Sequence, residues 1–437
     1  MKRVLIITYY WPPTGGSGVQ RWVKFAKYLP SEGWQPVIYT PENPEQLAVD
    51  TTLEKEIPAE AEIVKTHITE PYELYRKFLK RSGHSKDAVE VNPVNAQNKT
   101  FLQKAAMWVR GNFFRPDPRC LWIDPSVRFL EKYLKDHPVD LIVSTGPPQS
   151  MHLIGRKLAQ RTGLPWIADF RDPWTKIFYF KHLCLTKATE KWHMKMEKKV
   201  LDDATRVVAV SPLVQQEFQA MTQTPVELIT NGFDECDFAP EACKEAHGGP
   251  DADFTMTHTG LFAADGNPTV LWDVLAEKST TDENFRRQLK IRLVGKTDGQ
   301  IISSINDAGL KDNLIDMGYQ PHDAAIEQQR TASLLILPLR KEPEYKAVLP
   351  GKLFEYLASW RPVLGIGQPD GAMSMILGSA KAGKVLDWND KAAISQFIDE
   401  CWEKHQKGTL TIEGADLSQF TRRNLTAKMA ELFNSLT

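Results

Sequence analysis

The chain has 437 residues, of which 42% are apolar and 25% charged, with a net charge of −1 and a mean hydropathy of −0.37. This length exceeds one ordinary core and predicts two or three domains, while the balanced charge argues against nucleic-acid binding by the protein as a whole. The five cysteines are widely spaced without a C-x-x-C pair, which suggests neither a zinc ribbon nor a disulfide framework. No apolar run approaches the roughly 18 residues that a membrane span needs, so we expect a cytoplasmic protein.

The first half of the chain alternates short apolar runs with segments of helical periodicity. The expected strands are Val4 to Thr8, Pro36 to Thr40, Ala61 to Lys65, Leu141 to Ser144, Trp166 to Asp169, Arg206 to Val210 and Val226 to Thr230. Residues 71–120 lack this alternation and are interpreted as an insertion. Strands joined by helical crossovers predict one doubly wound α/β sheet over residues 1–232.

The second half repeats this pattern after residues 231–253, a stretch without periodicity that contains glycine and proline and is interpreted as a linker. Its expected strands are Thr255 to Gly260, Lys290 to Val294, Leu314 to Asp316, Leu334 to Leu337, Val363 to Ile366 and Gly383 to Leu386. These strands predict a second α/β sheet within residues 233–415. Residues 416–437 are expected to form a last helix with no strand after it.

The segment from Leu334 to Gly365 is the most informative. It reads as a buried strand, a charged loop, a helix that begins near Pro350 and a second strand. Glu355 stands about one turn inside that helix, at the carboxyl end of a parallel strand, where open α/β sheets bind ligands. Residues 355–363, with Glu-Tyr-Leu-Ala followed by Pro-Val, resemble the E-[AY]-x-A-x-x-x-P-V segment of retaining family-4 glycosyltransferases of the GT-B type. In that family the Glu holds the ribose hydroxyls of a nucleotide sugar.

The resemblance spans nearly the whole chain and implies its architecture and its substrates. In GT-B proteins two Rossmann-like doubly wound domains face each other across a cleft, and a terminal helix, here residues 416–437, crosses back to the first domain. The implied donor is a nucleoside-diphosphate sugar whose diphosphate is held by helix N-termini and basic side chains, so no metal ion is expected. The implied acceptor is a glycan or a lipid-linked sugar.

Two candidate donor contacts, Gly15 and Gly16, follow the first strand, and Arg21 stands one turn inside the next helix. Consecutive glycines let the backbone approach a ligand, and the start of a helix offers free N–H groups to a phosphate. The spacing is not that of the dinucleotide-binding G-x-G-x-x-G fingerprint. A tight turn that binds no ligand is the alternative for this loop.

His152 and Asp172 are the candidate catalytic residues. The segments around them, 144–152 and 168–174, resemble signatures of a subset of family-4-like transferases, in which either residue could bind the acceptor sugar. Neither has to act as a general base, because retaining transfer in this family is attributed to a front-face mechanism in which the leaving diphosphate accepts the acceptor proton. The alternative is that the aspartates of 168–174 cap the next helix and pair with Arg171.

The phosphate-binding half of the site departs from the family pattern, because residues 261–267 contain no basic side chain and position 347 of the E-x7-E motif is Ala. The positive charge that holds the diphosphate has to come from Lys296, Lys352 or the basic residues of the loop 340–346, unless helix amides bind most of the diphosphate. A solvated charged loop without a ligand is the alternative for 340–346. In the second domain the predicted donor-binding residues are Gly260, Lys296, Lys352, Leu353 and Glu355.

Two stretches of the first domain, 72–119 and 176–199, are rich in basic and aromatic residues. Such a surface suits an anionic membrane leaflet that carries a lipid-linked acceptor, and it predicts peripheral contact with the inner face of a membrane. The alternative is an insertion packed on its own domain with a solvated basic side.

We therefore expect a retaining glycosyltransferase that acts in surface-polysaccharide or glycan assembly and has no nucleic-acid partner. Two alternatives stay open. A nucleotide-sugar 2-epimerase shares the architecture, but it should carry a richer set of histidines and carboxylates in its cleft. A catalytically silent GT-B protein that binds a glycan or a partner transferase is kept open by Ala347 and by the missing basic pair.

Overall fold

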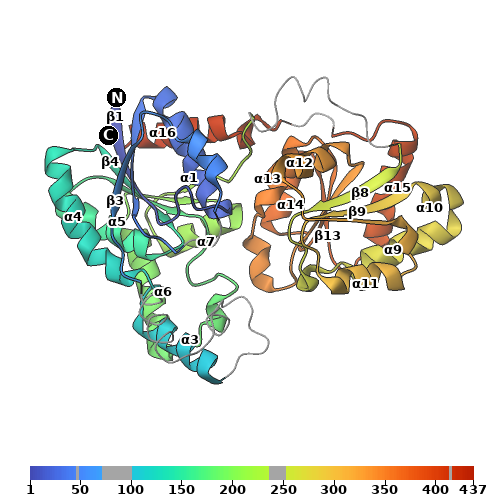
Figure 1. Cartoon of the computed structure of the whole chain (residues 1–437), viewed down its shortest axis with the longest axis horizontal. Coiled ribbons are helices and arrows are strands. Elements are labelled where there is room, and N and C mark those ends of the chain that lie inside the picture. Colours follow the sequence, from blue (N-terminus) through green and yellow to red (C-terminus); the bar gives the residue numbers. More distant parts are fainter. Residues whose placement is uncertain (46–48, 71–100, 236–251, 413–415) are drawn as a thin grey trace. The chain divides into compact units, whose positions relative to one another are not determined.

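The computed structural model describes residues 1–45, 49–70, 101–235, 252–412 and 416–437 (Figure 1). The chain divides into two compact units, the first made of Met1–Thr230 with Arg423–Thr437 and the second of Asn231–Arg422. Most of the predicted insertion (71–100) and of the predicted linker (236–251) lies outside the described residues.

Unit 1 is built on a seven-stranded parallel sheet of order β3-β2-β1-β4-β5-β6-β7. Its strands are β1 (Lys2–Ile7), β2 (Trp34–Pro41), β3 (Glu62–Thr66), β4 (Leu141–Gly146), β5 (Trp166–Phe170), β6 (Arg206–Ala209) and β7 (Val226–Leu228). Its helices are α1 (Ser17–Tyr28), α3 (Phe101–Phe113), α4 (Ile123–Asp136), α5 (Ser150–Thr162), α6 (Lys187–Asp203), α7 (Pro212–Met221) and α16 (Arg422–Asn434).

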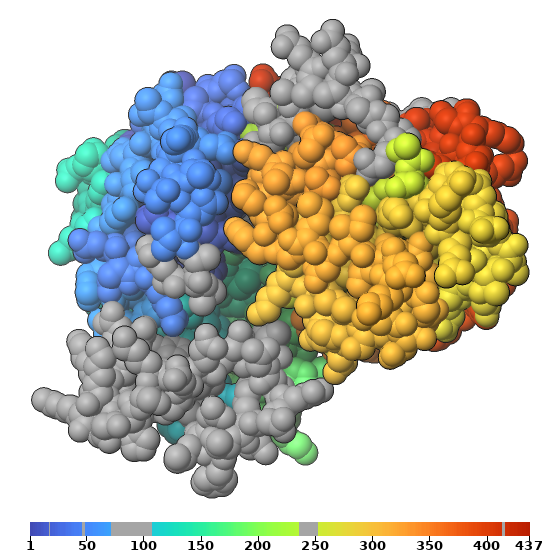
Figure 2. All heavy atoms as spheres, turned by 45° about the vertical axis from the view of Figure 1, so that its right-hand side comes forward, coloured from blue at the N-terminus to red at the C-terminus, as the bar shows by residue number. Residues whose placement is uncertain are grey.

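Unit 2 is built on a six-stranded parallel sheet of order β10-β9-β8-β11-β12-β13. Its strands are β8 (Phe254–Thr259), β9 (Leu289–Val294), β10 (Leu314–Gly318), β11 (Leu334–Pro338), β12 (Val363–Ile366) and β13 (Gly383–Leu386). Its helices are α9 (Thr269–Thr281), α10 (Glu283–Gln288), α11 (Gly299–Asp307), α12 (His322–Thr331), α13 (Gly351–Ala358), α14 (Ala372–Ser379) and α15 (Lys391–Gln406). These elements, coloured from yellow to red, pack into one contiguous body (Figure 2).

The terminal helix α16 shares the core of unit 1 although it follows unit 2 in the chain. Its Met429 and Phe433 lie in one buried apolar cluster with Trp22 of α1 and with Val4 and Ile6 of β1. Successive side chains of a strand point to opposite faces, so the alternate residues of β1 place α1 and α16 on the same face of the sheet. This packing holds residues 423–437 in unit 1.

Both sheets confirm the predicted fold class of two Rossmann-like doubly wound units. Each expected strand coincides with an observed one within a few residues, because strands covered by helices on both faces are continuous apolar runs. Within the described part of the chain, no helix combines the length and the apolar character that crossing a membrane requires.

Candidate functional site

The strand order of each sheet reverses direction at one point, and the carboxyl ends of the strands on either side of this switch point form the usual ligand crevice of an open α/β sheet. In unit 1 the switch point lies between β1 and β4, and in unit 2 it lies between β8 and β11. Buried polar side chains lie at both, Ser144 and Thr145 in unit 1 and His258 and Thr259 in unit 2.

In unit 2 the crevice is organised around Lys352, at the start of α13. Its ammonium group donates to the carbonyl of Leu261 at 3.0 Å and to Nε2 of His258 at 3.2 Å. Burial lowers the pKa of Lys352 to about 8, against the opposing effect of the Glu355 carboxylate. Since an ammonium has three N–H donors, one donor beyond these two contacts is left for a ligand.

His258, the next-to-last residue of β8, determines where this ammonium points. Its Nδ1 lies 3.0 Å from the carbonyl oxygen of Ile336, which can only accept, so the ring proton is on Nδ1. Burial, with a further contribution from Lys352, lowers the pKa of His258 to about 3, and the ring is therefore neutral. Its Nε2 lone pair is then the acceptor that holds Lys352.

Glu355 lies one turn beyond Lys352 on the same helix and is partly exposed. Its carboxylate accepts from the side-chain amide of Gln329 at 3.4 Å, and that amide also donates to the Thr259 hydroxyl at 3.1 Å. The Tyr356 hydroxyl accepts from the Thr259 backbone N–H at 2.8 Å. The predicted pair Lys352 and Glu355 is thus brought together with three polar residues at the carboxyl end of β8.

Two glycines let the backbone pass close to this cluster. Gly260 has φ +86, and a Cβ built on it would stand 3.1 Å from Cε of Lys352. Gly295 has φ +124, and a Cβ there would stand 2.4 Å from the Gly260 carbonyl oxygen. A side chain at either position would fill the space that the loops after β8 and β9 share. The Lys296 side chain is exposed, and its carbonyl accepts from the Phe262 N–H at 2.9 Å.

Leu353 does not face the crevice. Its side chain is fully buried in the apolar core of unit 2, and its backbone N–H bonds the Pro350 carbonyl at 3.0 Å. One residue of helix turns a side chain by about 100°, which carries Leu353 away from the Lys352 side. Its predicted donor contact is therefore corrected to a core position.

In unit 1 the loop after β1 carries the predicted glycines. Gly16 precedes α1 with φ +105 and ψ 167, a backbone conformation that is essentially restricted to glycine. A Cβ at Gly15 would stand 2.9 Å from Cβ of Asp50. Both positions exclude larger residues, and their predicted contact with the donor stays a prediction.

Arg21 points into unit 1 and is only 1% exposed. Its guanidinium contacts the Asp169 carboxylate of β5, with Nη2 to Oδ1 at 2.8 Å, and donates to the carbonyls of Ile229 and Thr230 at 2.9 and 2.8 Å. Asp169 also accepts from Trp22 and Thr145 at 2.8 Å each. This geometry gives Arg21 and Asp169 a structural role in place of the predicted phosphate contact.

His152 is fully buried in the first turn of α5. Its Nδ1 lies 2.9 Å from the Ser144 hydroxyl, and its ring stacks on Phe170 with centroids 4.2 Å apart. Burial lowers its pKa to about 3, so the ring is neutral. A group with no exposed surface cannot bind an acceptor sugar, and the predicted catalytic role of His152 is corrected to internal packing.

Asp172 follows β5 and is partly exposed. Burial raises its pKa to about 6, although the neighbouring Arg171 acts in the opposite direction. The Arg171 guanidinium donates to the carbonyls of Gly18 and Pro147, and helix α6 is capped by Thr186 rather than by an aspartate of this segment. Asp172 therefore remains the candidate acceptor contact of unit 1.

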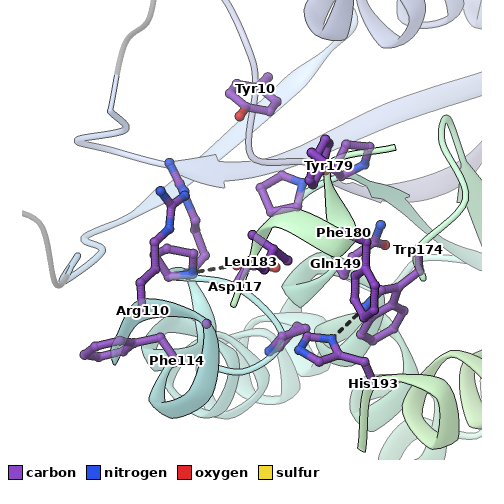
Figure 3. Close-up of a pocket in the computed structure, with 16 residues that line it drawn as sticks. Tyr10, Arg110, Phe114, Asp117, Gln149, Trp174, Tyr179, Phe180, Leu183 and His193 are labelled. Atoms are coloured by element: carbon purple, nitrogen blue, oxygen red, sulfur yellow. Dashed lines mark hydrogen bonds between the residues drawn. The ribbon is translucent and has the colours of Figure 1, made fainter. Parts of the chain in front are cut away.

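A cavity of about 190 Å³ opens beside Asp117 at the switch point of unit 1. Figure 3 shows Arg110 of α3 and Phe114, just after this helix, on one side, and Trp174, Phe180 and Gln149 on the other. His193 of α6 lies next to Trp174, to which it is hydrogen-bonded. Tyr10, after β1, Tyr179 and Leu183 are the other labelled residues of the wall (Figure 3).

Sequence reasoning missed His258 and Gln329, and it did not single out Gln149, Trp174 or His193 within the stretches 144–152, 168–174 and 176–199. Thr257-His258-Thr259-Gly260, a polar run that ends a buried strand just before a glycine, was the signal that could have identified His258. Gln329, 26 positions before Glu355, has no local signal. Among the described residues, no group of three His, Cys, Asp or Glu side chains could hold a metal ion.

Comparison with known proteins shows which family and which solved structures this chain resembles. The sequence profile of glycosyltransferase family 4 matches residues 16–235, just over half of the chain, whereas a search of curated proteins finds no match. Among solved structures, the chain is similar to the sucrose-phosphate synthase of Thermosynechococcus elongatus, with 14% identity, 100% and 99% of the two chains covered and a TM-score of 0.62.

Two other similar structures belong to proteins of glycan chemistry. A variant of S. aureus TarM, in complex with fondaparinux, α-GlcNAc-glycerol and UDP, shows 12% identity over 99% of this chain and 100% of its own, with a TM-score of 0.59. WaaG, a glycosyltransferase involved in lipopolysaccharide biosynthesis, shows 14% identity over 98% and 99%, with a TM-score of 0.51. With the profile match over half of its length and the two doubly wound sheets described above, the chain belongs to glycosyltransferase family 4 and is a glycosyltransferase of the GT-B fold.

Proposed function

We propose that this glycosyltransferase takes its sugar from a nucleoside-diphosphate sugar bound at the switch point of unit 2. The proposal rests on the position of Lys352 and Glu355, three residues apart on one side of α13, beside the glycine-lined end of β8. A carboxylate suits the two ribose hydroxyls, which donate, and an ammonium with a remaining N–H suits the diphosphate. Lys296, exposed at the end of β9, is a second candidate for the phosphates.

The transfer proposed is retaining and occurs on one face of the donor sugar. The bond from the anomeric carbon to the diphosphate breaks, the acceptor oxygen forms the new bond on the same face, and the acceptor proton passes to the leaving diphosphate. Lys352 stabilises the negative charge that develops on the diphosphate. Asp172 contacts the acceptor in unit 1. Gly15 and Gly16, in the loop after β1, stay proposed as contacts of the donor, with open space beside Gly16.

The acceptor proposed is a glycan or a lipid-linked sugar in surface-polysaccharide or glycan assembly. The likeness in fold to WaaG, with its role in lipopolysaccharide biosynthesis, supports this class. We also propose a cytoplasmic protein in peripheral contact with the inner face of a membrane, supported by the exposed Trp108, Val109 and Phe113 of α3. Four exposed lysines of α6 add positive charge: Lys187, Lys191, Lys195 and Lys198.

The experiment that tests the donor site compares Glu355→Gln with the unchanged protein. Calorimetric titration with UDP, GDP and ADP should show binding of at least one nucleotide, weakened by about 1–3 kcal/mol in the variant because a charged hydrogen-bond acceptor is lost. Glu327→Gln, on the exposed side of α12, is the matched control and should bind as the wild type does. Equal affinity in Glu355→Gln would remove the central contact of this proposal.

Transfer itself is tested by slow hydrolysis of the donor in the absence of an acceptor. Incubation with a panel of nucleoside-diphosphate sugars should release sugar from one of them, and the anomer first released should keep the configuration of the donor. Release of the opposite anomer would contradict the retaining mechanism while leaving the donor site in place.

A further inference from the structure

The cavity of unit 1 has a size and a lining that point to a small ligand. Its volume of about 190 Å³ gives room for at least about six water molecules at about 30 Å³ each, which is enough for one sugar ring. It lies at the carboxyl ends of β1 and β4, where the loops with Tyr10 and Pro147 begin. The cavity is therefore placed where this sheet would bind a substrate.

Most of the side chains that line the cavity are apolar and contain a ring. Five aromatic side chains and four prolines contribute to it, with Trp174, Tyr179 and Phe180 on one short segment (Figure 3). An aromatic face is electron-rich and attracts weakly positive C–H groups. A pyranose ring presents such C–H groups on its flat face and its hydroxyls at the rim, so it matches a wall of rings interrupted by a few polar atoms.

His193 supplies one of these polar atoms as a donor without a partner. The Trp174 indole N–H donates to its Nδ1 at 3.0 Å, and since an indole nitrogen can only donate, the ring proton is on Nε2. Burial lowers the pKa of His193 to about 4, so the ring is neutral. Nε2 has no hydrogen-bond partner among the described residues, although the side chain is 2% exposed and lines the cavity.

Gln149 supplies an acceptor without a partner. Its Oε1 is buried and makes no hydrogen bond within the described part of the chain, and the residue is 8% exposed. It stands just after β4, in the wall that includes Pro147 and Pro148. A Cβ on Gly146 would stand 2.9 Å from this Oε1 and 2.5 Å from the Nε2 of His152, which is also buried without a partner among the described residues, so Oε1 has a possible internal donor besides a ligand in the cavity. Buried polar atoms are nearly always paired in native structures, so the unpaired donor of His193 in this lining indicates a ligand that offers an acceptor.

The charged residues of the wall already have partners. Asp117 accepts from the Ser150 N–H and hydroxyl at 2.8 Å each, and Arg119 contacts the carboxylate of Glu45 at 3.2 Å. Arg110 also has an interaction of its own. A ligand with a net charge would gain little here, which favours a neutral one.

We propose that this cavity binds one neutral pyranose unit of the acceptor, with the ring face against Trp174 and Phe180, one hydroxyl accepting from His193 Nε2 and another donating to Gln149 Oε1. The inference rests on the proposed transferase function, because it assigns the acceptor of that reaction. An acyl chain would leave both polar atoms unpaired, and an anionic sugar would enter a wall that offers it no unengaged cation among the residues named above.

The test is ligand-observed saturation-transfer NMR on the full-length protein. The probes are the methyl glycosides of glucose, galactose, mannose, rhamnose and N-acetylglucosamine, with glucuronate as a charged probe and hexanediol as an apolar one. At least one neutral glycoside should bind, with its ring C–H protons most strongly saturated. Gln149→Met should weaken that binding by about tenfold, because the substitution keeps the side-chain length and removes the acceptor.

Gln160→Met is the matched control: it makes the same change at an exposed position of α5, the helix that Gln149 precedes, and should bind the glycoside as the wild type does. His193→Phe, which keeps a ring and removes the donor, should weaken binding to a similar extent. If His193→Phe does not fold, the binding measured with Gln149→Met tests the proposal. The proposal is overturned if no neutral glycoside binds, if glucuronate or hexanediol binds better, or if binding survives in Gln149→Met.

Nucleotide binding measured on the same samples keeps this inference separate from the proposed function. Glycoside binding without nucleotide binding would sink the donor proposal and leave the sugar cavity in place. Nucleotide binding without glycoside binding would overturn the cavity alone.

Discussion

At the scale of single residues, the ammonium of Lys352 has a charge that changes near neutral pH. Its pKa is lowered by burial to about 8 from an ordinary 10.5, whereas the adjacent His258 stays neutral because burial lowers its pKa to about 3. A pH titration across this range therefore reports on Lys352 and not on His258.

We expect the affinity for a nucleoside diphosphate to be nearly constant from about pH 7 to about pH 7.5 and then to fall by up to tenfold per pH unit above about pH 8, as the ammonium loses its proton. Calorimetric titrations at a series of pH values measure this. Lys352→Arg should flatten the profile, because a guanidinium keeps its charge throughout. A wild-type affinity that does not change with pH would place the phosphates away from Lys352.

The lowered pKa of Lys352 also affects the stability of the fold, which should rise with pH where the nucleotide affinity falls. Because the pKa of Lys352 is lower in the folded protein, folding disfavours its proton, and this group costs stability below about pH 8. The cost diminishes as the pH rises from about 8 towards 10.5. Weaker nucleotide binding in alkaline buffer therefore cannot be attributed to loss of the fold through this residue.

At the scale of elements, the pair of Arg21 and Asp169 joins α1 to β5, and the carbonyls of Ile229 and Thr230 join it to the end of the sheet. Burial alone would raise the pKa of Asp169, but the charge of Arg21 and the hydrogen bonds from Arg21, Trp22 and Thr145 lower it overall. The stability that this carboxylate contributes is therefore present above the ordinary Asp range and is lost on acidification below it.

We expect Arg21→Met to lower the free energy of unfolding of unit 1 by about 3–5 kcal/mol, because it leaves the Asp169 charge buried and unpaired. Urea unfolding monitored by circular dichroism measures this. Arg161→Met breaks an exposed pair with Glu131 at 2.8 Å and should cost about 0–1 kcal/mol. An Arg21→Met protein as stable as the wild type, yet inactive, would restore the phosphate contact predicted from the sequence.

At the scale of the whole molecule, the proposed transfer should not need a divalent ion. Helix amides near Gly351, with Lys352, would carry the roughly two negative charges of the diphosphate. Donor hydrolysis in excess EDTA should therefore proceed at the rate seen without it, while Lys352→Ala should be strongly impaired and still folded. Loss of activity on chelation that magnesium or manganese restores would assign the diphosphate to a metal ion.

Membrane contact is also a property of the whole molecule. We expect the protein to co-sediment with anionic vesicles and to dissociate as the ionic strength rises through about 0.15 M, where the screening length is about 8 Å. A double Trp108→Ser, Phe113→Ser variant of α3 should bind less, and Tyr319→Ser, which removes an aromatic ring that is 85% exposed, is the control. Equal binding to neutral and anionic vesicles would contradict the proposal.

Local sequence patterns were enough to predict the two α/β sheets and the shared helix face of Lys352 and Glu355. Buried parallel strands are continuous apolar runs, so each strand is visible locally, and β12 was predicted to the residue. Lys352 and Glu355 are three positions apart on one helix and therefore share a face in any structure that keeps this helix. The family resemblance added their roles, which periodicity alone does not give.

Which polar groups have partners inside the protein, and which can still bind a ligand, became clear from the folded structure. Arg21 and Asp169 pair across 148 positions, and no local pattern reveals that this arginine has found its partner. His152 is fully buried, and only the folded structure shows that the Nε2 of His193 has no partner among the described residues and that this side chain lines a cavity. The physical reason is that hydrogen-bond satisfaction depends on neighbours in space, which the order of residues along the chain does not specify.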